Sequence, residues 1–330
     1  MQKRASYAIS PSDETPIFYE VSAPPVVAGE RDHAAPVGVI SSVAPPPLTP
    51  AVLTDGIGCD GYVWKYLRRE LEGDRPVLHW HYRGHGRSPL PRDPRRVAIA
   101  DLADDLAAVL DDAGIDGAVV LGHSMGVQVA LETYRRHPDR VRGLVLLCGS
   151  PENPLRTFRG QRGLEVVLPR VRRAVERAPR LINQAARLLL PTRLAFRLAA
   201  KVEVNAELLD ATDFMPYLHG LSRVEMPFFL SMLAAAGEHS AVDMLASIAA
   251  PVLVVAGERD GFTPPELSRA MAAAIPGADL LEVEGGSHTA PLERPDLVGR
   301  AVGEFLAHRI DAGDPAEPLD QPALGRAPTG

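Results

Sequence analysis

Short apolar runs alternate with longer amphipathic stretches along most of this chain. Runs at 51–54, 77–80, 118–121, 143–148, 251–257 and 280–283 have the length and composition of strands that are buried on both faces. Between two of them, residues 101–113 place Leu102, Leu106, Val109 and Leu110 at helical spacing, which predicts an amphipathic helix. Strands that alternate with helices indicate an α/β fold with a mostly parallel sheet.

The polar side of that helix is acidic. It carries Asp104, Asp105, Asp111 and Asp112. We expect these four carboxylates to form a solvated face and not a metal site.

Three segments depart from the alternating pattern. Residues 6–21 predict a hairpin of two edge strands with its turn at 11–14. Residues 22–50 are too rich in proline for a central strand and indicate a long surface loop. From 151 to 250 the strand pattern stops and helical pattern replaces it. We therefore divide the chain into core parts at 1–150 and 251–310, a helical insertion at 151–250, and a disordered tail at 311–330.

Ser124 carries the strongest chemical signal. It lies in Gly122-His123-Ser124-Met125-Gly126, directly after an apolar run and before a stretch with helical pattern. A strand, then G-x-S-x-G, then a helix is the context of a nucleophile elbow, which exposes the serine hydroxyl at the end of a sheet. The alternative is a glycine-rich turn whose serine only caps the helix.

A catalytic serine needs a base, and the base needs an orienting group. Asp260 follows the predicted strand at 251–257, and His288 follows the predicted strand at 280–283. Both therefore lie past strand C-termini, the edge where open α/β sheets place their sites. Glu258 is the nearest competing carboxylate.

In these segments the chain resembles the serine-nucleophile branch of the α/β-hydrolase superfamily, from about residue 17 to about residue 308. The resemblance implies an eight-stranded, mostly parallel sheet flanked by helices, with 151–250 as a helical cap. Residues 51–58 look like the third strand and oxyanion loop, so the backbone N–H groups of Ile57 and Met125 would bind the oxyanion. Residues 82–88 resemble the R-G-x-G-x-S loop, which is mostly structural. The chain departs from the usual pattern at Asp55, which would put a carboxylate near the developing charge, and at His81.

The two halves of the helical insertion differ. The first is rich in arginine set among leucine and valine, which is typical of a solvated basic face or of a helix on an anionic membrane surface. We favour the solvated face. The second is apolar and should cover the active site, which predicts a mainly apolar acyl or alkyl pocket. Its candidate substrate contacts are Phe214, Phe228, Phe229 and Met232.

Composition and residue spacing bear on the partners, disulfides, cellular location and metal content to expect. The net charge of −7 gives no reason to expect a nucleic-acid partner. Cys59 and Cys148 should be free thiols, with Cys59 inert. We find no signal peptide or transmembrane segment and expect a cytoplasmic protein. The histidines at 79, 81 and 85 do not have metal-ligand spacing, so we expect no metal and no cofactor.

These features predict a serine hydrolase that cleaves a carboxylic ester bearing an apolar group. C–C bond hydrolysis, thioester hydrolysis and perhydrolysis use the same triad and stay open. A non-catalytic ligand-binding protein on the same scaffold is the alternative from another class.

Overall fold

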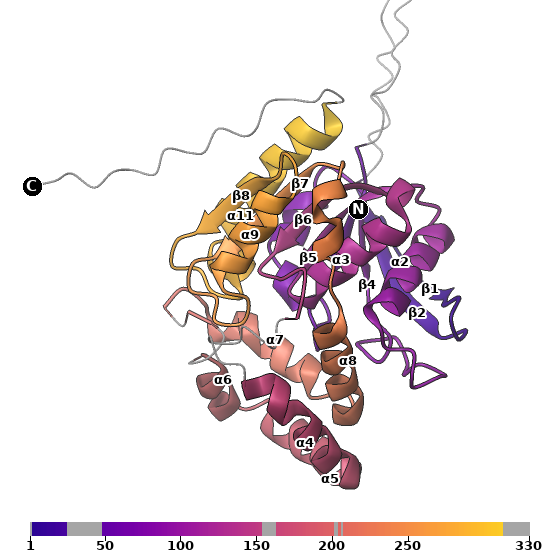
Figure 1. Ribbon diagram of the computed structural model, residues 1–330, viewed down its shortest axis with the longest axis vertical. Coiled ribbons are helices and arrows are strands. Elements are labelled where there is room, and N and C mark those ends of the chain that lie inside the picture. The colour runs from indigo at the N-terminus through magenta and orange to yellow at the C-terminus, as the bar shows by residue number, and fades with distance from the viewer. Residues whose placement is uncertain (1, 25–47, 154–162, 201–203, 206, 313–330) are drawn as a thin grey trace, which may run out of the picture.

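An eight-stranded sheet forms the centre of the computed structural model, which describes residues 2–24, 48–153, 163–200, 204–205 and 207–312 (Figure 1). The strand order is β1-β2-β4-β3-β5-β6-β7-β8. The strands are β1 (Gln2–Ile9), β2 (Pro16–Ala23), β3 (Ala51–Thr54), β4 (Val77–Trp80), β5 (Ala118–His123), β6 (Val141–Leu147), β7 (Val252–Gly257) and β8 (Asp279–Val283).

The first two strands form the predicted hairpin, and β2 also pairs antiparallel with β4. The prediction of two edge strands is therefore wrong for β2, which lies inside the sheet. Its residues Ile17, Phe18 and Tyr19 are almost fully buried, and Ile17 and Tyr19 belong to the hydrophobic core between the sheet and its helices. All remaining pairs are parallel, and every residue of β3, β4, β5 and β7 is buried.

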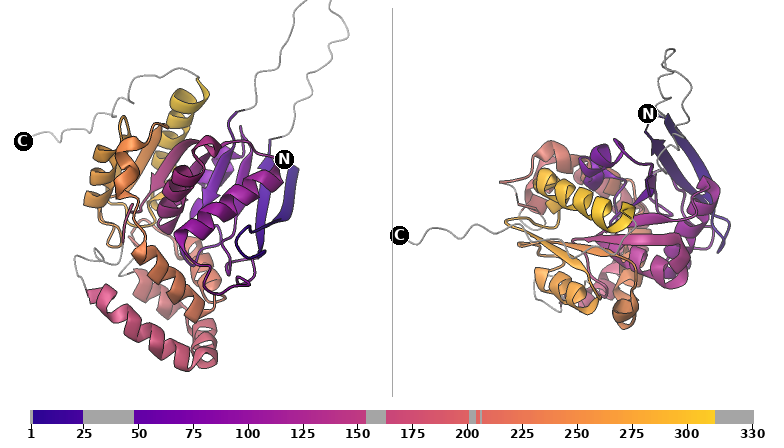
Figure 2. Two further views of the ribbon diagram at one scale, coloured as in Figure 1. Left: turned by 45° about the vertical axis from the view of Figure 1, so that its right-hand side comes forward. Right: turned by 90° about the horizontal axis from the view of Figure 1, so that it is seen from above.

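Helices cover both faces of the sheet (Figure 2). On one face lie α2, α3 and α9, and on the other α1, α10 and α11. Their bounds are α1 (Leu67–Leu71), α2 (Ile99–Ala113), α3 (Met125–Arg136), α9 (Pro265–Ala274), α10 (Ala290–Glu293) and α11 (Pro295–Phe305). Short 3-10 helices lie at Tyr62–Trp64, Pro138–Arg140 and Val242–Ser247, and a π-helix lies at Leu306–Asp311. This three-layer arrangement is the α/β hydrolase fold that the sequence predicts.

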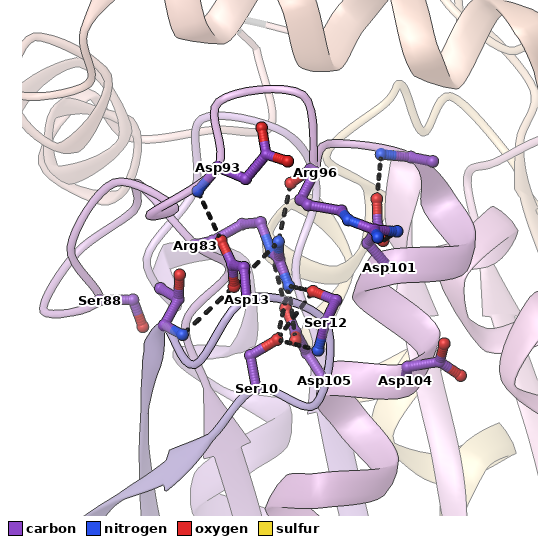
Figure 3. Close-up of polar contacts among 12 residues, drawn as sticks. Ser10, Ser12, Asp13, Arg83, Ser88, Asp93, Arg96, Asp101, Asp104 and Asp105 are labelled. Carbon is purple, nitrogen blue, oxygen red and sulfur yellow. Dashed lines mark hydrogen bonds and ion pairs between the residues drawn. The ribbon is translucent and has the colours of Figure 1, made fainter.

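One residue of the predicted solvated face of α2 is buried instead. The Asp105 side chain is fully buried and makes a two-pronged ion pair with the equally buried Arg83, with Arg83 Nε and Nη2 at 2.9 and 2.7 Å from its two oxygens (Figure 3). The reason is visible in the spacing, because Asp105 lies three residues after Leu102 and four before Val109, within the apolar stripe. The prediction that Asp105 is solvated is wrong.

The described part of the segment between β6 and β7 is mainly helical. It contains α4 (Gly163–Arg177), α5 (Pro179–Leu189), α6 (Arg193–Ala200), α7 (Ala211–Leu221) and α8 (Met226–Glu238). Figure 1 shows α7 and α8 next to the sheet and α4, α5 and α6 farther out. The division into core and cap domains stays a prediction. The proline-rich loop at 22–50 and the tail at 311–330 fall almost entirely outside the described residues. Of the helices in the described part of the chain, none has the length and apolar character needed to cross a bilayer.

Candidate active site

Ser124 occupies a strained turn between β5 and α3. Its φ of 57° lies in the left-handed region, which non-glycine residues rarely adopt. A Cβ atom on Gly122 would approach the Gly126 carbonyl oxygen to 2.3 Å, and one on Gly126 would approach the Thr54 carbonyl oxygen to 2.2 Å. Both glycines of the motif are thus required by close packing. The turn therefore has the geometry of a nucleophile elbow as well as its sequence.

The three predicted catalytic side chains lie in one line. His288 Nε2 is 2.9 Å from the Ser124 hydroxyl oxygen, and His288 Nδ1 is 2.9 Å from a carboxylate oxygen of Asp260. A carboxylate can only accept, so Nδ1 carries the proton and Nε2 offers its lone pair to the serine O–H. These residues come from the ends of β5, β7 and β8, which the parallel sheet brings to one edge.

The Asp260 carboxylate is buried and fully hydrogen-bonded. It accepts from the backbone N–H groups of Phe262 and Thr263 at 2.8 and 2.9 Å, and from the Thr263 hydroxyl at 2.7 Å. Burial alone would raise the pKa of Asp260, but the charge of His288 and these hydrogen bonds outweigh it and lower the pKa. The competing carboxylate, Glu258, instead accepts from the Gly285 backbone N–H at the surface.

The loop that carries Ile57 is held in place by the 82–88 loop. The Gly58 N–H donates to His85 Nε2 at 3.0 Å, while His85 Nδ1 lies 3.1 Å from the Arg83 carbonyl oxygen. The carbonyl can only accept, so Nδ1 carries the proton and Nε2 is the acceptor. Burial lowers the pKa of His85 and favours this neutral ring. Ile57 and Met125 both line the cavity beside Ser124, and Met125 is the first residue of α3, whose N–H has no acceptor within the helix.

Asp55 does not direct its carboxylate at the position of the developing charge. It is buried, and it accepts from the Trp64 indole at 2.7 Å and pairs with His79 Nε2 at 2.9 Å. Burial would raise the pKa of Asp55, but His79 outweighs it and lowers the pKa. Asp55, which departs from the family pattern, thus belongs to a structural hydrogen-bond network under the oxyanion loop. Within the described residues, no three His, Cys, Asp or Glu side chains are placed to hold a metal ion.

A cavity of about 260 Å³ opens beside Ser124 and His288. Much of its wall is apolar and comes from α7 and α8. Of the predicted substrate contacts, Phe229 lines it. Phe214 instead packs against the rings of Tyr62 and Tyr217, and Phe228 and Met232 are buried in the core. These three are therefore not among the lining residues of the cavity. Side chains that do line it are Ile57, Tyr62, Met125, Tyr217, Leu221, Phe229, Leu233 and Phe262.

Two polar residues that the sequence analysis did not single out also line the cavity. His123 Nε2 donates to the His288 carbonyl oxygen at 2.8 Å, and burial together with the charge of His288 lowers the His123 pKa to about 4. Gln128 donates to the Ala236 carbonyl oxygen at 2.9 Å, and its own carbonyl oxygen is buried without a partner. Gln128 lies four residues after Ser124, so the helical period could have placed it on the same side of α3.

The His288 loop has a further buried support. Glu293 accepts from the Ser287 backbone N–H at 2.6 Å, from the Ser287 hydroxyl at 2.5 Å and from the Thr289 hydroxyl at 2.9 Å. These contacts fix the residues on both sides of His288. No sequence signal pointed to Glu293, because its role depends on how the loop folds back on α10.

Neither cysteine forms a disulfide in the described part of the chain, in agreement with the prediction of thiols. Cys148 is buried beneath the His288 loop, and burial raises the pKa of its thiol well above the ordinary value. Cys59 is also buried and lies at the cavity wall near Ile57.

Comparison with known proteins identifies the family. A sequence model described as the alpha/beta hydrolase fold matches residues 52–295, which is most of the chain. The chain therefore belongs to the α/β hydrolase fold family, and it is a hydrolase.

Its relatives are hydrolases as well. The chain is similar to a putative carbamate hydrolase, RutD, of Azorhizobium caulinodans, with 31% identity over 261 residues that cover 78% of this chain and 91% of the relative. Two solved structures are similar in fold, each at 22% identity. One is an enol-lactonase from Burkholderia xenovorans, with a TM-score of 0.68 and coverage of 92% and 100%. The other is a thermophilic esterase from Thermogutta terrifontis, with a TM-score of 0.65 and coverage of 93% and 98%. At this identity, the likeness to the two solved structures shows the fold alone.

Proposed function

We propose that the protein is a serine hydrolase that cleaves a carboxylic ester with an apolar acyl or alkyl group, and that Ser124, His288 and Asp260 are its catalytic triad. The observation that supports this most is the contact of 2.9 Å between Ser124 Oγ and His288 Nε2 at a strained elbow. A serine that only capped α3 would direct its oxygen at the helix, but its side chain makes no capping bond to the helix backbone.

In the first half-reaction, the Ser124 oxygen attacks the substrate carbonyl carbon while its proton passes to His288 Nε2. A bond forms between the serine oxygen and the carbonyl carbon, and the carbonyl oxygen becomes an oxyanion. Asp260 holds the His288 tautomer that can accept this proton, and it stabilises the imidazolium. The hydrogen bonds to Asp260 keep it ionised for this role.

The oxyanion would be stabilised by the backbone N–H groups of Ile57 and Met125. Loss of one donor of this kind lowers kcat by about 100- to 1,000-fold in other enzymes. The Met125 N–H also lies at the positive end of the α3 dipole. By fixing Gly58, His85 holds the Ile57 loop in register without touching substrate.

Collapse of the tetrahedral intermediate breaks the bond from carbon to the leaving oxygen, which takes the proton from His288 Nε2. The acyl group stays on Ser124. Water then enters, gives a proton to His288 and attacks the acyl carbon, and the second collapse returns the proton to the serine oxygen as the acid leaves. The apolar cavity of about 260 Å³ supports a substrate with a small to medium apolar group.

A carbamate is a second candidate substrate, and Gln128 is the observation that favours it. Its buried carbonyl oxygen has no donor, although nearly all buried polar groups in folded proteins have a partner. A substrate N–H placed one helical turn from Ser124 would supply one. The similarity to putative carbamate hydrolases agrees with this, although they share only about a third or less of the sequence. Thioester cleavage, C–C cleavage, perhydrolysis and a cytoplasmic location stay predictions from the sequence.

Labelling with a fluorophosphonate tests the triad without knowledge of the substrate. The probe should form one adduct, located at Ser124 by peptide mass spectrometry, and Ser124→Ala should abolish it. Ser150→Ala is the matched control, because Ser150 also lines the cavity but its hydroxyl oxygen accepts from the Glu152 backbone N–H at 3.2 Å. A wild-type protein that stays unlabelled while folded would favour the non-catalytic binding protein. Hydrolysis of matched ester, thioester, carbamate and vinylogous diketo acid substrates would then assign the reaction.

A further inference from the structure

The outer helices α4, α5 and α6 form the end of the molecule farthest from the sheet (Figures 1 and 2). Inside this layer, α4 and α5 pack on α8, and α6 packs on α7. Each outer helix therefore has one side against the protein and another side directed outward. We call α4, α5 and α6 the outer layer.

The outward side of this layer carries large apolar residues. Of the eleven large apolar side chains exposed in the described part of the chain, seven belong to it. They include Leu181 and Leu188 on α5, which are 66% and 75% exposed, and Leu194 and Leu198 on α6, which are 65% and 59% exposed. Residues four or seven apart share a side of a helix, so these leucines form rows. Val167 and Val171 repeat the arrangement on α4, and Leu189 is the seventh. Single exposed apolar residues are ordinary, but such a concentration indicates an interaction surface.

The same layer is strongly basic. Residues 163–200 contain eight arginines and two glutamates, a net charge of +6 in a chain whose total is −7. Arg172 pairs with Glu176, but Arg177, Arg180, Arg193 and Arg197 form no ion pair with another described residue. Arg193 and Arg197 are four apart beside Leu194 and Leu198, so basic and apolar rows run next to each other. The arginines at 156, 159 and 162 lie outside the described residues.

We propose that the outer layer docks the protein on a bilayer surface that contains anionic lipid headgroups. Leucines such as Leu181 and Leu188 would enter the boundary between headgroups and acyl chains, and the arginines would contact lipid phosphate. Such helices lie in the plane of the interface without crossing it. This interpretation replaces the solvated basic face that we favoured from the sequence. A nucleic acid would satisfy the arginines and leave the leucines in water. A second copy would cover the leucines but bring two surfaces of +6 together.

Vesicle flotation of the full chain tests the proposal directly. Vesicles contain either phosphatidylglycerol mixed with phosphatidylcholine or phosphatidylcholine alone. The wild type should float with the anionic vesicles at low salt and release at about 1 M salt, where the Debye length falls to about 3 Å. Binding to the neutral vesicles should be at least about tenfold weaker, since each basic residue near an anionic surface contributes measurably.

Two variants separate the apolar and the electrostatic contributions. Leu181→Ser combined with Leu188→Ser should weaken binding by more than about tenfold, because burial of each leucine is favourable. The second variant should weaken binding to anionic vesicles by about a hundredfold or more. It replaces four arginines by glutamine: Arg177, Arg180, Arg193 and Arg197. The changed side chains are at the surface, so the fold should persist, and circular dichroism checks this.

A matched control changes exposed residues of the core, with Leu90→Ser, Arg92→Gln and Arg95→Gln together. It should bind like the wild type, and so should Ser124→Ala, which separates this proposal from the hydrolase proposal. Failure to float with anionic vesicles would overturn the proposal, and so would equal binding to neutral vesicles. A concentration-dependent dimer that the leucine variant dissociates, seen by light scattering, would assign the surface to a second copy instead.

Discussion

Asp105→Asn removes the negative charge from a fully buried ion pair and leaves its partner, Arg83, in place. Both side chains are fully buried, and the guanidinium makes two hydrogen bonds to the two carboxylate oxygens. Arg83 also donates to the Ser10 hydroxyl and to the Arg96 carbonyl oxygen at 2.9 and 2.8 Å (Figure 3). After the substitution these neutral acceptors remain, but no carboxylate balances the buried positive charge at hydrogen-bond distance.

The expected loss follows from the burial. Removal of one partner of a buried pair typically lowers the free energy of unfolding by about 3–5 kcal/mol. Asparagine keeps one acceptor for Arg83, and Asp13 lies 3.7 Å away, so we expect about 3 kcal/mol, the low end of this range. Burial raises the pKa of Asp105 even beside Arg83, which shows that desolvation opposes the pair. A double variant, Arg83→Met with Asp105→Leu, should therefore be more stable than Asp105→Asn.

Urea denaturation followed by circular dichroism measures the effect as a shift of the unfolding midpoint. Asp111→Asn is the matched control on the same helix. Asp111 pairs with Arg140, but its side chain is 68% exposed, so its loss should lower stability by about 1 kcal/mol or less. Equal midpoints for the two variants would show that burial does not set the size of the stability loss.

Three further predictions concern the site and its pH dependence. Asp260→Asn should lower kcat by about 10,000-fold through the wrong His288 tautomer, measured on a p-nitrophenyl ester, and an unchanged rate would assign the role to another carboxylate. His85→Phe removes the acceptor of the Gly58 N–H. Because the oxyanion loop is then displaced while substrate contacts are kept, kcat should fall by about tenfold or more and KM should change less. Equal changes in kcat and KM would contradict a positioning role for His85. Burial lowers the pKa values of His81 and His123 to about 4. Below pH 6.5 the unfolded chain therefore binds protons at these rings that the folded protein does not. The folded state should lose on the order of 3 kcal/mol of stability for each ring as the pH falls from 6.5 toward 4. A Tm that stays constant from pH 7 to pH 4.5 would show that these rings are not held neutral.

Local patterns were sufficient to predict the sheet and to select Ser124, Asp260 and His288, which the structure brings into contact. The run before Ser124, the glycines around it and the turns after β7 and β8 are contiguous in sequence, so each could be read without knowledge of distant contacts. The parallel topology then brings the ends of β5, β7 and β8 to one edge, which is why Asp260 and His288 meet as predicted.

Residues whose role depends on distant partners could not be assigned in this way. From the sequence, Asp55 was expected to place its carboxylate near the oxyanion. Its actual partners, Trp64 and His79, come from other segments, so the local sequence does not reveal them. Of the substrate contacts predicted on α7 and α8, only Phe229 is among the residues that line the cavity, for the same reason. Several apolar residues there have similar patterns, and only the packing decides that Phe229 lines the cavity while Phe228 enters the core. Phe228 and Phe229 are neighbours in sequence, so they point to different sides of α8.

Steady-state hydrolysis of p-nitrophenyl esters from acetyl to palmitoyl tests whether Ser124 is the nucleophile. We expect turnover by the wild type, with a preferred chain length set by the cavity of about 260 Å³. In Ser124→Ala, kcat should fall by at least about 10,000-fold while the protein stays folded. Turnover by Ser124→Ala at the wild-type rate would show that Ser124 is not the nucleophile.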